Sequence, residues 1–228
     1  MAKLLFTAIV ADMRNKLNGT VFSKNRYGAY ARTKVTPVNP QTTRQQAQRN
    51  RLSTNSAAWR GLTETQRQSW IDGAINFPQT DIFGNSKILS GQALYVKFNN
   101  NLNTISASAI TTCPTPVAIP ALSITSVAAD DSANTVIITA TTPVPTGFAM
   151  VVSATPNVTA GKTFVKNLYR FVQNFAAAAA GPFDISTAYT ALFGDTVTGN
   201  KVFVSMFLVS TTTGQAGIPV SAMTVVVA

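Results

Sequence analysis

The residues that most constrain the fold are Pro114, Pro116 and Pro120, which lie in or at the end of a stretch of small residues, 106–120. Proline removes a backbone donor and pushes the preceding residue towards extended backbone, so no regular helix can run through this stretch. The hydrophobic period is helical before the stretch and alternating after it. The chain therefore predicts an α+β protein in which 106–120 is a proline-rich linker between two differently built parts.

The C-terminal part, 121–228, predicts an immunoglobulin-like β-sandwich. Strand patterns occur at 133–141, 148–155, 163–172, 200–210 and 219–227, with weaker ones near 121–127 and 174–180. Seven short strands separated by turn signals, without helical periodicity, are typical of a seven-stranded sandwich. A chain of 228 residues is long enough to bury a core in each of two domains.

Residues 36–105 predict a small helical domain. Its first helix is expected to begin at Thr42 or Thr43, whose hydroxyl can accept a hydrogen bond from an unpaired backbone N–H of the first turn. We expect this helix to end at Gly61, because glycine tolerates the left-handed conformation that often follows the last turn of a helix.

Two more helices are expected in the same domain. Thr63 and Gln66 have the spacing of a capping box, so a second helix should start there and reach about residue 74. Ser90 can cap a third helix over 90–103. The first two helices are expected to form an αα-hairpin closed by two tryptophans. Its core is predicted from an apolar stripe at helical spacing: Leu52, Trp59, Leu62, Trp70 and Ile71.

Positive charge is concentrated at the start of the chain. Residues 1–60 hold eleven Lys or Arg and one acid, Asp12, which gives +10. Residues 61–228 hold seven basic and seven acidic residues, which gives zero, so the whole net charge of +10 lies in the first quarter. This asymmetry predicts an acidic partner, either a protein surface or a nucleic acid.

Residues 1–35 are expected to form a basic β arm. The apolar segment 4–11 resembles part of a signal peptide, but Asp12 and Arg14 follow it without a convincing cleavage site, so a strand is the better interpretation. Residues 20–35 have an extended pattern that a turn at Tyr27 and Gly28 can interrupt; if the segment is extended throughout, its even positions share a face. In this segment the even positions carry Lys24, Arg26, Tyr30, Arg32 and Lys34, and the first helix adds Arg44, Arg49 and Arg51.

Two partners fit these eight residues. Basic strands with interleaved tyrosines can contact phosphates and stack on bases, which favours nucleic acid. The same face can instead dock on acidic patches of neighbouring protein subunits. No compact RNA-binding or helix-turn-helix signature accompanies the charge, and this favours the protein partner.

The sequence carries few residues for catalysis. It has no histidine, the commonest general base and metal ligand, and one cysteine, Cys113, which excludes an intramolecular disulfide. Gly161–Thr163 resembles the end of a phosphate-binding loop, but Pro156 stands where the first glycine is needed. No run approaches the ~18 apolar residues of a membrane span. We therefore expect no enzyme, no cofactor, no metal and no membrane partner.

Four runs of the N-terminal part carry a family resemblance: YGAYAR (27–32), PVNPQTTRQQAQRN (37–50), AWRGLTETQRQSW (58–70) and LSGQ (89–92). Together they resemble a family of uncharacterised virion proteins of tailed bacteriophages and prophages, with a basic N-terminal region and often a C-terminal immunoglobulin-like domain. The resemblance covers roughly residues 18–100 and supplies no catalytic residues.

The resemblance implies a place in the virion, with assembly in the cytoplasm of the bacterial host. The expected function is that of a capsid-associated auxiliary or decoration protein, present in many copies or as a homo-oligomer, that binds capsid or connector subunits. The alternatives are a tail or head–tail connector component, or a nucleic-acid-binding protein packaged with the genome.

Overall fold

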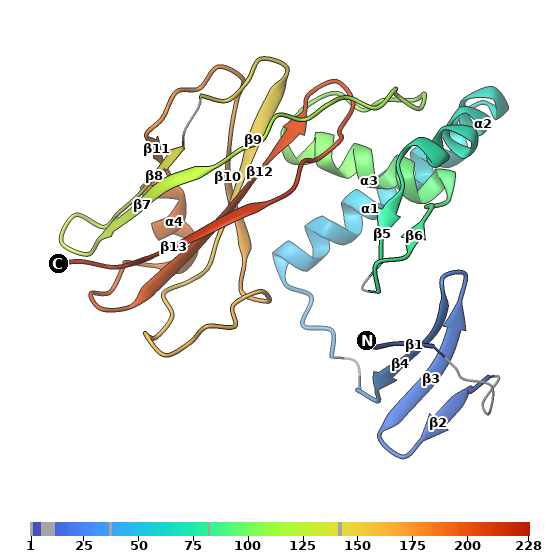
Figure 1. Cartoon of the computed structure of the whole chain (residues 1–228), viewed down its shortest axis with the longest axis horizontal. Coiled ribbons are helices and arrows are strands. Elements are labelled where there is room, and N and C mark those ends of the chain that lie inside the picture. Colours follow the sequence, from blue (N-terminus) through green and yellow to red (C-terminus); the bar gives the residue numbers. More distant parts are fainter. Residues whose placement is uncertain (1, 6–11, 37, 82, 141–142) are drawn as a thin grey trace.

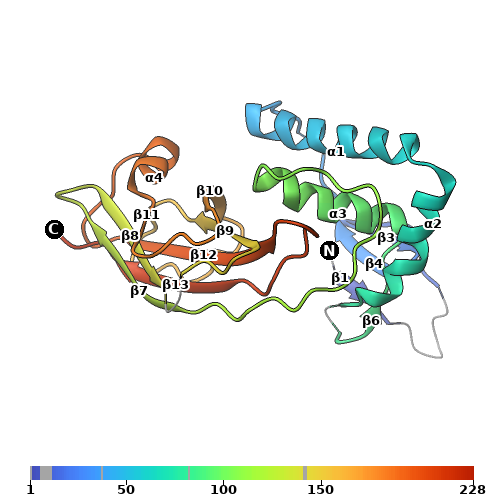
Figure 2. The same cartoon turned by 90° about the horizontal axis from the view of Figure 1, so that it is seen from above.

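The computed structural model describes the whole chain except residues 1, 6–11, 37, 82 and 141–142. An N-terminal sheet, a helical part and a C-terminal sandwich follow one another along the chain (Figure 1). Viewed from above, the sandwich lies on one side of the molecule, and the helices, overlapped by the N-terminal sheet in this view, lie on the other (Figure 2). The expected α+β class is confirmed, with a β arm, a small helical domain and an immunoglobulin-like sandwich. No helix in the described ranges is both long and apolar enough to cross a bilayer.

The N-terminal sheet has four antiparallel strands in the order β1-β4-β3-β2. They are β1 (Ala2–Leu4), β2 (Asn15–Leu17), β3 (Thr20–Asn25) and β4 (Gly28–Thr33). A turn at Asn18 and Gly19 joins β2 to β3, and the hairpin loop at Arg26 and Tyr27 joins β3 to β4. The strand predicted over 4–11 lies mostly outside the described residues, and β1 ends at Leu4.

The first helix, α1 (Thr43–Gly61), begins as its sequence predicts, because the Thr42 hydroxyl accepts from the Gln45 N–H at 3.3 Å. Its predicted end at Gly61 is confirmed, but the left-handed conformation expected there is wrong. Gly61 is still helical, and the chain leaves through the extended residue Leu62, with φ −67° and ψ 148°. No left-handed residue is needed there, because Leu62 turns the chain directly into the next cap.

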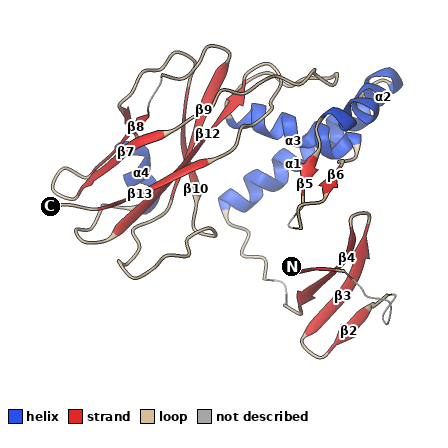
Figure 3. Cartoon of the chain, in the orientation of Figure 1, coloured by secondary structure: helices blue, strands red, loops and turns tan. Residues whose placement is uncertain are grey.

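The other helices follow their predicted caps. In α2 (Glu64–Gly73) both hydrogen bonds of the Thr63 and Gln66 capping box are present, and a 3-10 turn, η1 (Ala74–Asn76), follows. A short hairpin of β5 (Gln79–Thr80) and β6 (Ser86–Lys87) then leads to α3 (Gly91–Thr104). The Ser90 hydroxyl caps α3. The three helices and the short hairpin are distinguished by colour in Figure 3.

The predicted αα-hairpin is not formed, because α1 and α2 both pack on α3. Trp70 is fully buried, with its ring centroid 5.4 Å from that of Tyr95. Trp59 is half-buried on the same tyrosine, also at 5.4 Å, so the two tryptophans flank Tyr95 instead of closing on each other. Leu62 is buried with them in the helical core.

Two of the predicted core residues are wrong. Leu52 is 53% exposed and Ile71 is 52% exposed. Both were predicted to lie in the core of the hairpin. Since each helix instead buries a narrow stripe against α3, these side chains face outwards.

The sandwich consists of a four-stranded sheet, β10-β9-β12-β13, and a three-stranded sheet, β11-β8-β7. The strands are β7 (Ile124–Asp130), β8 (Thr135–Ala140), β9 (Phe148–Ala154), β10 (Arg170–Phe175), β11 (Phe183–Asp184), β12 (Lys201–Ser210) and β13 (Val220–Val225). In immunoglobulin-like sandwiches the first, second and fifth strands share one sheet, and the third, sixth and seventh share the other. This division holds here, and the fourth strand joins the third.

Two details of the sandwich differ from the sequence-based expectation. The strand predicted at 163–172 begins only at Arg170, because turns occupy the residues before it. A helix, α4 (Ser186–Phe193), was not expected. Its helical signal is present, since Ile185 and Tyr189 are four residues apart and both are buried at 1% and 0% exposure.

The linker 106–120 has no helix or strand, as expected, and its half-buried residues, among them Cys113 and Val117, pack against the helical core and the sandwich core respectively. The Trp70 indole N–H donates to the carbonyl of Thr111 at 2.9 Å, and the Val117 N–H donates to the side chain of Gln215 at 2.9 Å. Beside it, the C-terminal end of α3 contacts the outer face of the four-stranded sheet through a third hydrophobic cluster: Leu102, Ile105, Ala149, Val151 and Val209. The helical part and the sandwich therefore touch across this cluster.

Candidate functional site

The strand pairing divides the N-terminal sheet into two chemically different faces. Residues directly opposite each other in an antiparallel ladder share a face. Lys3 lies opposite Tyr30, and Arg32 lies opposite Val21, which in turn lies opposite Lys16. We call this side the basic face, consisting of Lys3, Lys16, Val21, Ser23, Tyr30 and Arg32. The other side is the apolar face, with Leu4, Leu17, Phe22, Ala29 and Ala31.

A hollow of about 600 Å³ lies on the basic face. Its lining consists of Arg14, Asn15, Lys16, Val21, Phe22, Ser23, Lys24, Asn25, Tyr30 and Arg32. Arg14 forms an ion pair with Asp12 at 2.9 Å. Lys16, Lys24 and Arg32 form no ion pair with any residue that the structure describes. Three of the four cations that line the hollow therefore have no counter-charge among the described residues.

The structure brings together only some of the residues predicted on the basic strand. Tyr30 and Arg32 share the basic face, and Lys34 follows directly after β4. Arg26 lies in the hairpin loop. Lys24 was predicted on the same face as Tyr30, and this is wrong: it lies opposite Ala29 and therefore belongs to the apolar face, although it borders the hollow.

The arginines predicted on the first helix lie on a separate element. Arg44 and Arg49 are exposed on α1, and Arg49 donates to the side chain of Asn39 at 2.7 Å. Arg51 faces α3, where its guanidinium lies 3.5 Å from the Thr104 hydroxyl. The helix carries four arginines, these three and Arg60, and no acidic residue.

Two cations of the basic face were missed by sequence reasoning, Lys3 and Lys16. Lys16 could have been found, because the turn at Asn18 and Gly19 fixes the register that places it opposite Val21. Lys3 could not, because its place depends on the pairing of β1 with β4, which are distant in sequence.

Lys3 also joins the sheet to the helical part. Its ammonium forms an ion pair with Asp81 in the loop between β5 and β6, and lies 5.5 Å from the ring centroid of Phe83. The hydrogen bond from Lys3 holds the pKa of the Asp81 carboxyl below its usual range, and backbone N–H groups of Phe83 and Asn85 act in the same direction against partial desolvation. A second contact places the Lys87 ammonium 5.5 Å from the centre of the Tyr27 ring.

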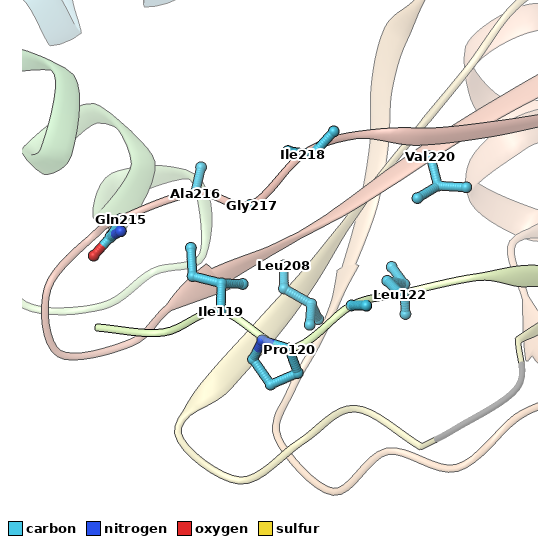
Figure 4. Close-up of a pocket in the computed structure, with 10 residues that line it drawn as sticks. Ile119, Pro120, Leu122, Leu208, Gln215, Ala216, Gly217, Ile218 and Val220 are labelled. Carbon is cyan, nitrogen blue, oxygen red and sulfur yellow. The ribbon is translucent and has the colours of Figure 1, made fainter. Parts of the chain in front are cut away.

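A second hollow, of about 490 Å³, lies where the end of the linker runs beside the chain that leads from β12 to β13 (Figure 4). Its lining includes Ile119, Leu122, Leu208 and Val220, and no titratable side chain. A hollow without an ionisable group offers hydrophobic contact but no acid–base chemistry.

The described residues provide no group of three His, Cys, Asp or Glu side chains that could hold a metal ion. Burial raises the pKa of the Cys113 thiol, which keeps the sulfur protonated and therefore weakly nucleophilic. Of the features described, the basic face is therefore the best candidate for a functional site, and what it can do chemically is bind anions. Comparison with known protein families, with curated proteins and with solved structures finds no match to this chain.

Proposed function

We propose that this protein is a structural component of a tailed-bacteriophage virion, a capsid-associated auxiliary or decoration protein that binds an acidic surface of other virion subunits through its basic face. The observation that carries the proposal is the unpaired positive charge of the N-terminal sheet. Like charges held close together cost free energy, and this cost is offset when an anionic partner is bound. The family resemblance of residues 18–100 supports the virion as the setting.

The sandwich is the complementary part of the proposal. Residues 121–228 hold four basic and four acidic residues, so this domain is neutral. A neutral module with a buried core suits display or lateral packing on a particle surface. Its function is therefore assigned to position and contact, and the protein is proposed to act without catalysis.

The experiment that tests this proposal reverses charge on the basic face. Arg32→Glu with Lys34→Glu changes the charge by four units at exposed positions. The matched control is Lys162→Glu with Lys166→Glu, the same change on exposed residues of the loop between β9 and β10. Copies per purified particle are counted against the major capsid protein, with genome content measured in parallel.

We expect the Arg32 and Lys34 variant to be lost from particles, while the control variant is incorporated normally and genome content is unchanged in both. Normal incorporation of the Arg32 and Lys34 variant would contradict the proposal. The copy number in wild-type particles decides between positions, because a decoration protein is present in many copies and a tail or connector component in few.

One observation favours the second candidate, a packaged nucleic-acid-binding protein. Helix α1 has Arg44 in its first turn and no acid there, although a cation at a helix N-terminus is unfavourable. A phosphate backbone would offset that cost. Under the main proposal, duplex DNA is bound only non-specifically, with a Kd on the order of 10⁻⁴–10⁻⁶ M at physiological salt. Tight binding that persists at this salt, with unchanged particles after charge reversal, would establish the alternative.

A further inference from the structure

The loop between β5 and β6 occupies one end of the basic face. Lys3 belongs to that face by its pairing with Tyr30, and its ammonium forms the ion pair with Asp81. A hollow of about 290 Å³ lies between the sheet and this loop, lined by residues of both, including Tyr27, Tyr30 and Lys87. One cation of the basic face is thus already neutralised by a carboxylate of the same chain.

The Asp81 carboxylate is held in place by its own turn. One oxygen accepts hydrogen bonds from the N–H groups of Phe83 at 2.7 Å and Asn85 at 3.1 Å, and the other faces Lys3. The side chain of Asp81 is 8% exposed and that of Lys3 is 23% exposed. The Phe83 ring lies beside the same ammonium, in the arrangement of a cation–π contact. A rigid turn therefore presents a carboxylate and an aromatic ring together.

The attachment of the sheet to the rest of the chain is narrow. Within the described residues, Lys3 to Asp81 is the only hydrogen bond or ion pair that joins the N-terminal sheet to any residue beyond 42. The Lys3 and Lys87 ring contacts accompany it. Because the Asp81 carboxylate is nearly buried, a partner can displace it only by offering Lys3 another carboxylate, so that the lysine keeps a counter-charge.

We propose that Asp81 occupies, in the free protein, the place of a carboxylate of the partner protein, and that the partner binds the basic face by displacing the loop between β5 and β6. The partner surface is therefore a turn or edge that presents Asp or Glu carboxylates. This inference rests on the proposed function and specifies its partner. Protein is favoured over nucleic acid because the internal occupant of this face is a carboxylate.

The test uses the full chain with Asp81→Asn. Asparagine keeps an oxygen that can accept from the turn N–H groups, so the turn is retained while the charge that holds Lys3 is removed. The control is Asp72→Asn, an exposed carboxylate on α2 whose described side-chain partner is Gln68. Both variants raise the net charge equally. The probe is poly-L-glutamate, and duplex DNA is measured beside it at the same salt concentration.

We expect Asp81→Asn to bind poly-L-glutamate at least about threefold more tightly than Asp72→Asn, because removing an internal competitor raises the fraction of molecules with a free face. Adding Lys3→Met to Asp81→Asn should reduce the gain in affinity for poly-L-glutamate, since it removes the ammonium group that Asp81→Asn releases. Limited proteolysis after residue 34 should be faster in Asp81→Asn than in Asp72→Asn, which reports release of the sheet without any ligand.

Equal affinities and equal cleavage rates for the two Asn variants would overturn the inference. A larger gain for duplex DNA than for poly-L-glutamate would overturn its choice of a carboxylate partner. The outcome is separable from the test of function: if Asp81→Asn releases the sheet while particles tolerate charge reversal at Arg32 and Lys34, the internal contact stands and the virion proposal fails.

Discussion

The N-terminal sheet and the sandwich are both antiparallel, but they use their side chains in opposite ways. In the sandwich, Val136 and Ile138 of one sheet and Val152 and Val204 of the other are fully buried between the layers. In the N-terminal sheet the only residue below one tenth exposure, among those described, is Ala29, and Leu17 is 63% exposed. The sandwich sheets bury their apolar faces against each other, whereas both faces of the N-terminal sheet remain largely accessible.

The proposed binding face therefore belongs to the part of the molecule with the least buried apolar surface. Each large apolar side chain that is fully buried contributes about 1.5–3 kcal/mol, and the sandwich has many of them. A small sheet without such burial is marginally stable in water. Repulsion between the positive charges of the N-terminal sheet lowers its stability further. An anionic partner that binds the folded sheet would therefore also stabilise it.

The largest expected effect tests whether the sandwich is stable without the helical core. Trp70→Ala should cost about 3–5 kcal/mol, because the side chain is fully buried and its ring contacts Tyr95 and Phe98. Urea denaturation is followed by fluorescence of the remaining Trp59 and by circular dichroism of the strands. The helical transition should shift to lower urea while the sandwich transition is retained. Loss of both transitions together would show that the sandwich depends on the helical core for its stability.

Trp59→Ala is the matched control for this prediction. Trp59 is half-buried and contacts the same Tyr95 from the side of α1. Because part of its surface is already exposed to water, its removal should cost clearly less than that of Trp70, about 1–3 kcal/mol. Equal costs for the two variants would contradict the burial difference.

Local hydrogen bonding explains which parts of the fold could be predicted. The Thr63 and Gln66 capping box and the Ser90 cap involve groups three residues apart, so the sequence specifies them directly. The strand alternation of β12 is equally local. By contrast, the exposure of Leu52 and Ile71 depends on α3, a partner that the apolar stripe does not identify.

The basic face shows the same limit. Because Asn25 pairs with Gly28 across a two-residue loop, even positions of β3 share a face with odd positions of β4. Lys24 therefore leaves the face of Tyr30 as soon as the segment folds back, and a single extended strand is the wrong model for it. The sequence alone identifies the basic segment, but it does not give the strand register that assigns each basic residue to one face of the sheet.

The second prediction addresses the contact between the sandwich and α3. Gly214 has φ +71°, and a Cβ there would lie 2.5 Å from the carbonyl oxygen of Phe98. Gly214→Ala should destabilise the contact between α3 and the sandwich by about 1–3 kcal/mol, seen as a helical transition at lower urea. Gly199→Ala is the control, since its φ is +80° with nothing within 4 Å of the added Cβ. Equal costs in both variants would assign the effect to backbone strain alone.

The third prediction compares how readily the two sheets detach. Residues 34–36 are exposed and lie outside any helix or strand, between β4 and α1. Limited proteolysis of the free protein should clip the N-terminal region and leave a fragment that begins near Thr36. This cleavage should be about tenfold faster than cleavage in the exposed loop around Lys162, a difference worth about 1.4 kcal/mol. Full protection of the N-terminal sheet in the free protein would remove the contrast between the two regions.

The smallest effect is the pH dependence of the contact between Lys3 and Asp81. The pKa of Asp81 is lowered from 3.8 in the docked state, chiefly by the hydrogen bond from Lys3. A depressed carboxyl pKa means that docking is stabilised above pH 3.8 and loses this contribution as the pH falls through the lowered value. The pKa values of Asp130 and Asp184 are also lowered, by Ser132 and Ser186 respectively, so a global unfolding curve would mix several titrations. The readout must therefore be local: the NMR shifts of Lys3 and Phe83 should move with the Asp81 titration in the wild type and stay constant in Asp81→Asn. Shifts that titrate equally in both proteins would show that another group controls the docking of the sheet.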